Sequence, residues 1–151
     1  MRDGQGLEVA NASAETIAAI DLLREEWLAF GKRLPEAVAA ADREQGCALL
    51  PLMSANLLLT VNSPAALEIA TRQAAKGRKL AGSDRREQGW LAATEAAFSH
   101  DKRTAQRLLE DLLAEWPRDL VAAKVAQVHA IDRGDAEGIL RIGERIVPAN
   151  P

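Results

Sequence analysis

Few side chains in this sequence could carry out chemistry. The chain has two histidines, His100 and His129, and a single cysteine, Cys47. His100 lies at a predicted turn and His129 within a predicted helix, so each is expected to be a surface or packing residue rather than a general base. His129 and Asp132 are three residues apart, which would place two metal ligands on one helical face. Because no third or fourth ligand lies nearby in the sequence, we predict no metal site.

The sequence also lacks the motifs by which common active sites are recognised. It has no glycine-rich phosphate loop, no nucleophile elbow and no His-Glu-x-x-His zinc motif. Cys47 begins an apolar stretch and is predicted to be an inert core residue. We therefore predict no catalytic residue and no cofactor. An enzyme with an unrecognised helical active site stays open as the alternative, because one helical fold can host many functions.

Composition limits the classes of partner. The 151 residues carry a formal net charge of −3 at pH 7, which argues against a protein that binds nucleic acid by neutralising phosphates. A single cysteine excludes an internal disulfide and fits a reducing compartment, so we expect a cytoplasmic protein. The longest uncharged stretch, residues 47–67, contains two prolines and several polar residues. It is therefore predicted to be a buried helix followed by a turn, rather than a membrane span.

The histidines, the cysteine and the acidic residues are predicted to lie on helices or on the turns between them. Between Asp101 and Pro117 the apolar residues follow the i, i+3, i+4, i+7, i+8, i+11 spacing of one helical face: Ala105, Leu108, Leu109, Leu112, Leu113 and Trp116. The pattern returns 34 residues later, where Asp135 matches Asp101 and Pro151 matches Pro117. A period of about 34 residues with paired helices is typical of tetratricopeptide-type helical hairpins. Asp101 and Asp135 are predicted to be equivalent N-caps.

Turn and cap residues divide the rest of the chain into helices, with no segment typical of a strand. Residues 1–12 are polar, contain Gly4 and Gly6, and are predicted to form a flexible N-terminal tail. Residues 13–151 are predicted to form one helical-repeat domain, with helices near 13–31, 35–45, 47–61, 64–80, 84–97, 101–116, 118–132 and 135–147. The predicted fold class is all-α, a tetratricopeptide-like α-solenoid of about four antiparallel helical hairpins.

Three segments of the C-terminal half resemble a known family. They are Arg86–Phe98, Trp116–Ala122 and the pair Gly134-Asp135. Over residues 85–151 they are similar to the tetratricopeptide repeat protein 38 family, which implies an α-solenoid and no defined chemistry. Members of that family continue with further helical repeats, so a fragment of a longer repeat protein is another alternative. His100-Asp101 stands where the family has a Gly-Asp turn.

In tetratricopeptide-like stacks the first helix of each hairpin lines a concave groove. By that analogy the groove-facing residues are Met53, Asn56, Thr60, Glu87, Trp90, Thr94, Phe98, Val121, Lys124, Val128 and Ile131. Trp90 is either an exposed anchor for a partner or a tryptophan buried between helices. Asn56 and Lys124 could belong to a carboxylate-binding set, but Glu87 and Trp90 on the middle helix favour an apolar or amphipathic peptide. We therefore predict a protein-interaction module with a protein or peptide partner, bound as a helix or an extended chain.

The last predicted helix has a wide apolar arc and a narrow polar stripe. Ile139, Ile142 and Ile146 lie on the arc. Repeat stacks need a terminal unit with a polar outer face to stay soluble. We therefore expect Ile142 and its neighbours to be covered by a second copy of the chain, giving a symmetric homodimer, or by another partner.

Overall fold

A computed structural model describes all 151 residues of the chain. It contains eight α-helices, one short 3₁₀ turn and no strand beyond an isolated bridge between Arg2 and Glu8, which confirms the all-α fold class. The elements are α1 (Ala14–Ala29), α2 (Leu34–Arg43), α3 (Leu49–Leu59), α4 (Pro64–Leu80), α5 (Arg85–Phe98), α6 (Lys102–Glu115), α7 (Leu120–Asp132), α8 (Ala136–Ile146) and η1 (Val147–Ala149). Every helix falls short of the length and apolar content that crossing a membrane requires.

Aspartate and serine side chains fix where most helices begin. Asp101 Oδ1 accepts a hydrogen bond from the backbone N–H of Thr104 at 3.0 Å, and Asp135 Oδ1 accepts one from Gly138 at 2.9 Å. The two aspartates are therefore equivalent N-caps, as their 34-residue spacing predicts. The same kind of cap is made by Ser13, Ser63, Asp84 and Asp119.

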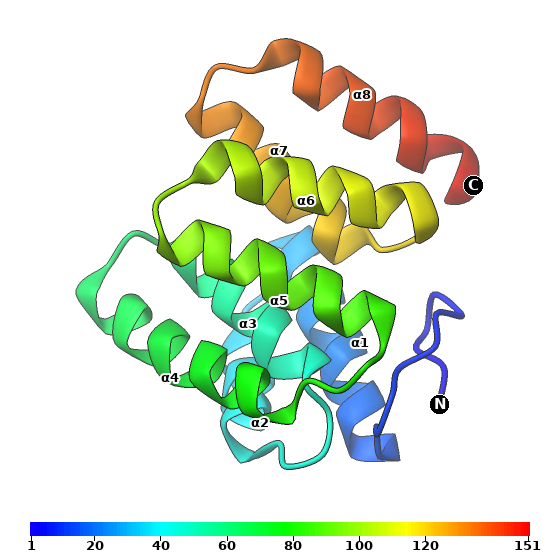
Figure 1. Ribbon diagram of the computed structural model, residues 1–151. Helices are drawn as coiled ribbons and strands as arrows, with labels where there is room; N and C mark the ends of the chain where they lie inside the picture. The colour runs from blue at the N-terminus through cyan, green and yellow to red at the C-terminus, as the bar shows by residue number, and fades with distance from the viewer.

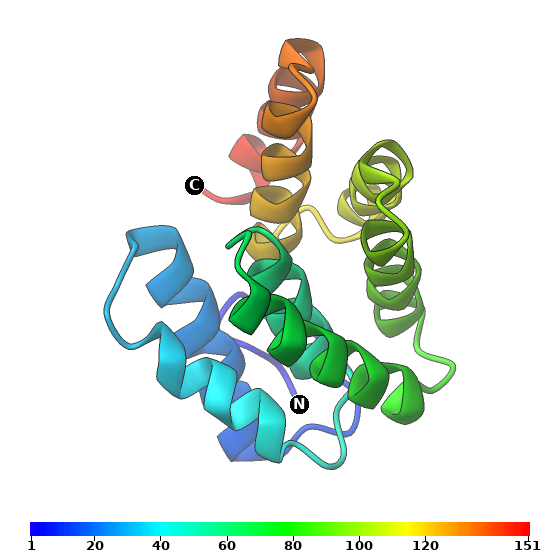
Figure 2. The same cartoon turned by 90° about the vertical axis from the view of Figure 1, so that its left-hand side faces the viewer.

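Helix α3 lies at the centre of the molecule. Every residue from Leu49 to Leu58 is buried, which agrees with a helix that is apolar nearly all round. It packs against α1, α2, α4, α5 and α7, and each consecutive pair of helices from α1 and α2 to α7 and α8 also packs together. Figure 2 shows α1 and α2 on one side of α3 and α4, with α5 and α6 on the other side.

The N-terminal segment is packed against the helices, so the prediction of a flexible tail at residues 1–12 is wrong. Leu7 and Val9 are buried at 7% and 2% exposure, and the carboxylate of Asp3 lies 3.6 Å from the guanidinium of Arg86 on α5. Gly4 donates its backbone N–H to Asp21 on α1 at 2.8 Å. The prediction rested on the polar composition of the segment. It failed because the residues that hold the segment, Asp21 and Arg86, lie far away in the sequence. Figure 1 shows the segment on the right of the molecule.

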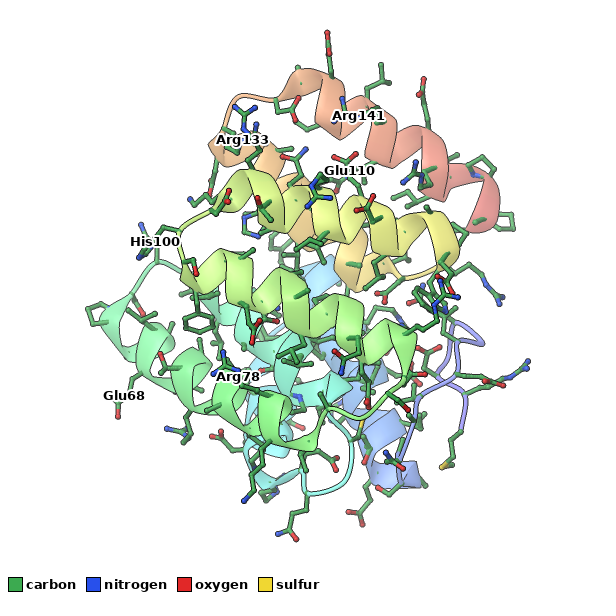
Figure 3. All side chains as sticks on the ribbon, in the orientation of Figure 1. Glu68, Arg78, His100, Glu110, Arg133 and Arg141 are labelled. Carbon is green, nitrogen blue, oxygen red and sulfur yellow. The ribbon has the colours of Figure 1, made fainter.

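Helix α8 turns its apolar arc inward, which corrects the predicted C-terminal interface. Ile142 is 1% exposed within the hydrophobic core, and Ile139 and Ile146 are half-buried. The reason is that α8 packs against both α6 and α7, so its apolar residues are removed from water within the chain itself. Arg141 on α8 also pairs with Glu110 on α6, with its Nε 3.3 Å from the carboxylate (Figure 3). The large apolar side chains that remain exposed at this end are Leu140 and Val147.

Candidate binding pocket

Most of the residues predicted to line a concave groove lie inside the core. Met53, Asn56, Glu87, Trp90, Thr94 and Val121 are all 2% exposed or less. Trp90 is completely buried, and its indole N–H donates to Asp119 Oδ2 at 3.2 Å. Of the two alternatives for Trp90, the buried one is therefore correct, and an exposed partner anchor at this position is wrong.

The first helix closes the space in which the groove was expected. Helix α1 contacts both α3 and α7. At this contact the Lys124 ammonium on α7 donates to the backbone carbonyl of Trp27 at 3.0 Å and lies 4.1 Å from the centre of the Phe30 ring. Lys124 is therefore engaged within the chain. The sequence pattern identified the inward faces of α3, α5 and α7 but could not indicate that α1 packs against α3 and α7.

An open pocket of about 560 Å³ lies at one edge of the molecule, beside the α3–α4 and α5–α6 turns. Figure 1 shows these turns on its left, and Figure 3 labels His100 there. The lining residues are Leu58, Leu59, Thr60, Asn62, Ser63, Pro64, Leu67, Ala97, Phe98, His100, Lys102, Val128, His129 and Asp132. Three of them, Thr60, Phe98 and Val128, belong to the predicted groove, so the pattern located part of this site.

Both histidines of the chain line this pocket. His129 is 6% exposed, and neither ring nitrogen has a hydrogen-bond partner. Burial lowers the pKa of the His129 imidazole; Lys102 and Arg133 act in the same direction, and Asp132 opposes them. The ring is therefore neutral near pH 7 and carries one donor and one acceptor nitrogen. The sequence analysis expected His129 to be a surface or packing residue. It is buried, but its position in the wall of a pocket was not predicted.

An ion pair joins α6 to α7 at the same pocket. The ammonium of Lys102 lies 2.6 Å from Asp132 Oδ2, and the two side chains are 48% and 41% exposed. Asp132 therefore pairs with a lysine, and no group of three or more histidine, cysteine, aspartate or glutamate side chains gathers closely enough to hold a metal ion. Sequence reasoning missed Lys102 because it is 30 residues from its partner.

His100 occupies a strained backbone position at the pocket. Its φ is 59°, in the left-handed region, and the equivalent residue of the next turn is Gly134 with a φ of 67°. Glycine adopts this conformation freely, whereas other residues do so at a cost of roughly 1–2 kcal/mol. The sequence indicated this turn through the predicted N-cap at Asp101 and through His100-Asp101 in place of Gly-Asp.

The hydroxyl groups of the pocket are already engaged with the backbone. Thr60 Oγ1 donates to the carbonyl of Leu57 at 2.6 Å, and Ser63 Oγ accepts the N–H of Ala66 at 3.1 Å. Neither is hydrogen-bonded to a histidine, as an activated nucleophile would be. The lining mixes apolar side chains with polar ones, as ligand-binding sites commonly do.

Two other polar groups in the core do not reach this pocket. Burial raises the pKa of the Glu87 carboxyl, although the backbone N–H groups of Gly82 and Ala48 oppose the shift. Glu87 Oε2 accepts the Gly82 N–H at 3.1 Å. Arg86, with side-chain exposure of 2%, lies between Asp3 and Asp119 and joins the N-terminal segment to α5 and α7.

Comparison of the sequence with protein-family models found no match, and searches of curated proteins and of solved structures found none either. The function is therefore inferred from the pocket and the surface around it.

Proposed function

We propose that this chain is a tetratricopeptide-like α-solenoid that acts as a cytoplasmic protein-interaction module and has no catalytic activity of its own. The 34-residue repeat of the Asp101 and Asp135 caps supports this architecture, as does the packing of consecutive helices. The proposed likeness to the tetratricopeptide repeat protein 38 family agrees with both features.

The partner peptide is proposed to bind at the pocket rather than along the concave face. The observation that carries this proposal is the set of apolar side chains that line the pocket. Leu67 lines it and is 50% exposed, and Phe98 and Val128 line it as well. Exposed apolar groups around a concavity are typical of a surface that a partner covers. An apolar side chain of the peptide would occupy the space beside Phe98 and Val128.

An enzyme is the second candidate, because both histidines and Asp132 line one pocket. A general base needs a ring nitrogen within reach of the substrate, and the nitrogens of His129 are shielded from solvent. The hydroxyls of Thr60 and Ser63 are bonded to the backbone, and neither is bonded to a histidine that could activate it. These contacts favour binding over catalysis.

Selection of displayed peptides on the wild-type chain tests the proposal. The selected peptides are then measured against Leu67→Asp and against the matched control Leu140→Asp, whose leucine is 62% exposed on α8. We expect Leu67→Asp to weaken binding at least about tenfold, as loss of an interface anchor does, and Leu140→Asp to leave it unchanged. Equal binding to both variants would place the peptide site elsewhere, and conversion of a bound peptide to products would favour the enzyme.

A further inference from the structure

We propose that the outer face of α8 docks an amphipathic helix of a partner protein, with lysine or arginine bordering the apolar stripe of that helix. Four residues at positions i, i+4, i+7 and i+11 make up the outer face: Ala136, Leu140, Gly143 and Val147. Helix α8 packs against α6 and α7, and Figure 1 shows it at the upper edge of the molecule. None of the four residues lines the pocket, so this face is a separate surface.

The outer face exposes large apolar side chains. Leu140 is 62% exposed and Val147 is 68% exposed, and Ala136 is exposed as well. Val147 follows the last residue of α8 but has helical φ and ψ of −58° and −46°, so it continues the same face. Ile142, on the opposite side of the helix, is 1% exposed. Because a helix that buries one side only normally carries polar residues on the other, the apolar outer side is suited to a second contact.

Gly143 lies within the outer face, between Leu140 and Val147. A Cβ atom added to it would meet no other atom within 4 Å, and its φ lies outside the left-handed region that favours glycine. Neither space nor backbone conformation within the chain therefore requires glycine, which stabilises a helix less than alanine does. The missing side chain lets the backbone of a second helix approach α8 closely.

Two acidic residues border the outer face on one side. Glu137 is three residues before Leu140, and Glu144 is four residues after it. Side chains three and four positions apart are neighbours on a helix, so Leu140 lies between the two carboxylates. Both glutamates are exposed.

The two arginines of α8 are engaged on the side that faces α6. Arg141 Nε lies 3.3 Å from the carboxylate of Glu110, and Arg145 donates to the backbone carbonyl of Glu110 (Figure 3). Neither guanidinium forms an ion pair with Glu137 or Glu144. Cations on a docked helix would meet these two carboxylates, which sets the orientation and choice of partner more than the affinity.

A second copy of the chain does not match this charge pattern. A two-fold pair of antiparallel α8 helices would bring the same border of each helix together, so Glu137 and Glu144 would face like charges. A parallel pair would place them against Ile139 and Ile146 on the other border, where no cation is available. An anionic membrane surface would repel the same carboxylates. A basic amphipathic helix satisfies both the apolar stripe and its acidic border.

Fluorescence anisotropy of labelled peptides on the full chain tests this docking. Three helical peptides of about eighteen residues, or about five turns, are compared. The first has a leucine stripe bordered by lysines, the second has glutamates in place of the lysines, and the third is a scrambled form of the first. We expect the lysine peptide to bind at least about tenfold more tightly than the other two, and less tightly as the salt rises from about 50 to about 500 mM.

Two variants of the outer face test the apolar contact. Leu140→Asp should weaken the lysine peptide at least about tenfold, as loss of an interface anchor does. Gly143→Met should also weaken it, because the new side chain blocks close approach, while thermal unfolding should occur at or above the wild-type temperature because methionine favours a helix. The matched control is Val61→Asp, whose valine is 54% exposed in the α3–α4 turn and which should leave binding unchanged.

A pair of glutamine substitutions tests the charge contact. Glu137→Gln combined with Glu144→Gln should weaken the lysine peptide several-fold and remove most of its salt dependence. The control combines Glu15→Gln with Glu68→Gln, which changes the net charge equally at exposed glutamates of α1 and α4 and should have little effect. This control separates docking at α8 from general attraction of a basic peptide to an acidic chain.

Each remaining result would overturn the docking of a basic helix at α8. Such results are equal binding of the lysine and glutamate peptides, equal losses from the two glutamine pairs, binding indifferent to Leu140→Asp, and no binding at all. A dimer in sedimentation that Leu140→Asp dissolves would make a second copy the occupant instead. Displayed peptides that lose binding to Leu67→Asp report on the pocket, so the proposed function is decided separately.

Discussion

Replacing Asp119 with alanine removes several contacts at once. Asp119 Oδ2 accepts hydrogen bonds from Arg86 Nε at 3.0 Å, from Arg86 Nη2 at 2.8 Å and from Trp90 Nε1 at 3.2 Å. Asp119 Oδ1 accepts the backbone N–H of Ala122 at 3.0 Å and so caps α7. The side chains of Arg86 and Asp119 are 2% and 0% exposed, so water cannot replace the lost carboxylate.

The expected loss in the free energy of unfolding is about 4 kcal/mol. Removing one partner of a buried ion pair costs about 3–5 kcal/mol, because the other charge remains buried. Asp3 still lies 3.6 Å from the Arg86 guanidinium, which argues for the lower end of that range. Loss of the α7 N-cap adds about 1 kcal/mol. The total is a large part of the roughly 5–15 kcal/mol that typically stabilises a whole domain.

Urea unfolding followed by tryptophan fluorescence measures this loss. Asp119→Asn keeps one acceptor oxygen, for either Trp90 or Ala122, and removes the charge, so its loss should lie between those of wild type and Asp119→Ala. The matched control is Asp111→Ala, which removes a surface pair with Arg107 and should cost less than about 1 kcal/mol. A loss below about 1 kcal/mol for Asp119→Ala would refute the reasoning, because the buried pair would then contribute no more than an exposed one.

Four further predictions concern stability and assembly. Trp90→Ala should lower the free energy of unfolding by about 3–5 kcal/mol because it empties a core position, and an unchanged melting temperature would contradict this. Asp101→Ala and Asp135→Ala should each cost about 1 kcal/mol in thermal unfolding, and markedly unequal losses would show that the two caps are not equivalent. Ile142→Arg should destabilise the monomer by about 3 kcal/mol or more, whereas a stable variant with altered sedimentation would restore the predicted dimer interface. Burial lowers the pKa of His129 below 6.5, so the unfolded chain binds the proton more readily, and stability should fall as the pH drops below about 6.5. The fall should be smaller in His129→Phe, and parallel pH profiles of the two proteins would show that this histidine contributes nothing.

Local features of the fold could be predicted from the sequence because they depend on neighbouring residues. Ser63 with Pro64 marks the start of α4, and the start and end of that helix match the prediction. The Asp101 and Asp135 caps need only a backbone N–H three residues further on. Each interaction closes within one helical turn, so residue type and spacing are sufficient.

The pocket and the closed groove depend on contacts that spacing cannot indicate. Trp90 has the same periodic position whether it is buried or exposed. The contact by which α1 packs on α7 joins Lys124 to Trp27 across 97 residues. His129 and Lys102 enter the pocket on different helices, and their charges become relevant to each other only after α6 and α7 pack. Asp3 and Arg86 are also far apart in the sequence, so no local pattern indicates that they pair.

The buried link between the N-terminal segment and α5 has a consequence for synthesis on the ribosome. Residues 1–9 leave the exit tunnel well before Arg86 and Asp119 have been made, so Leu7 and Val9 cannot be buried in the native way at first. Helical repeats normally assemble from local contacts and fold quickly, whereas pairing across a long stretch of chain is slow. Residues 1–9 are thus among the last to dock, and until then Leu7 and Val9 stay exposed during translation.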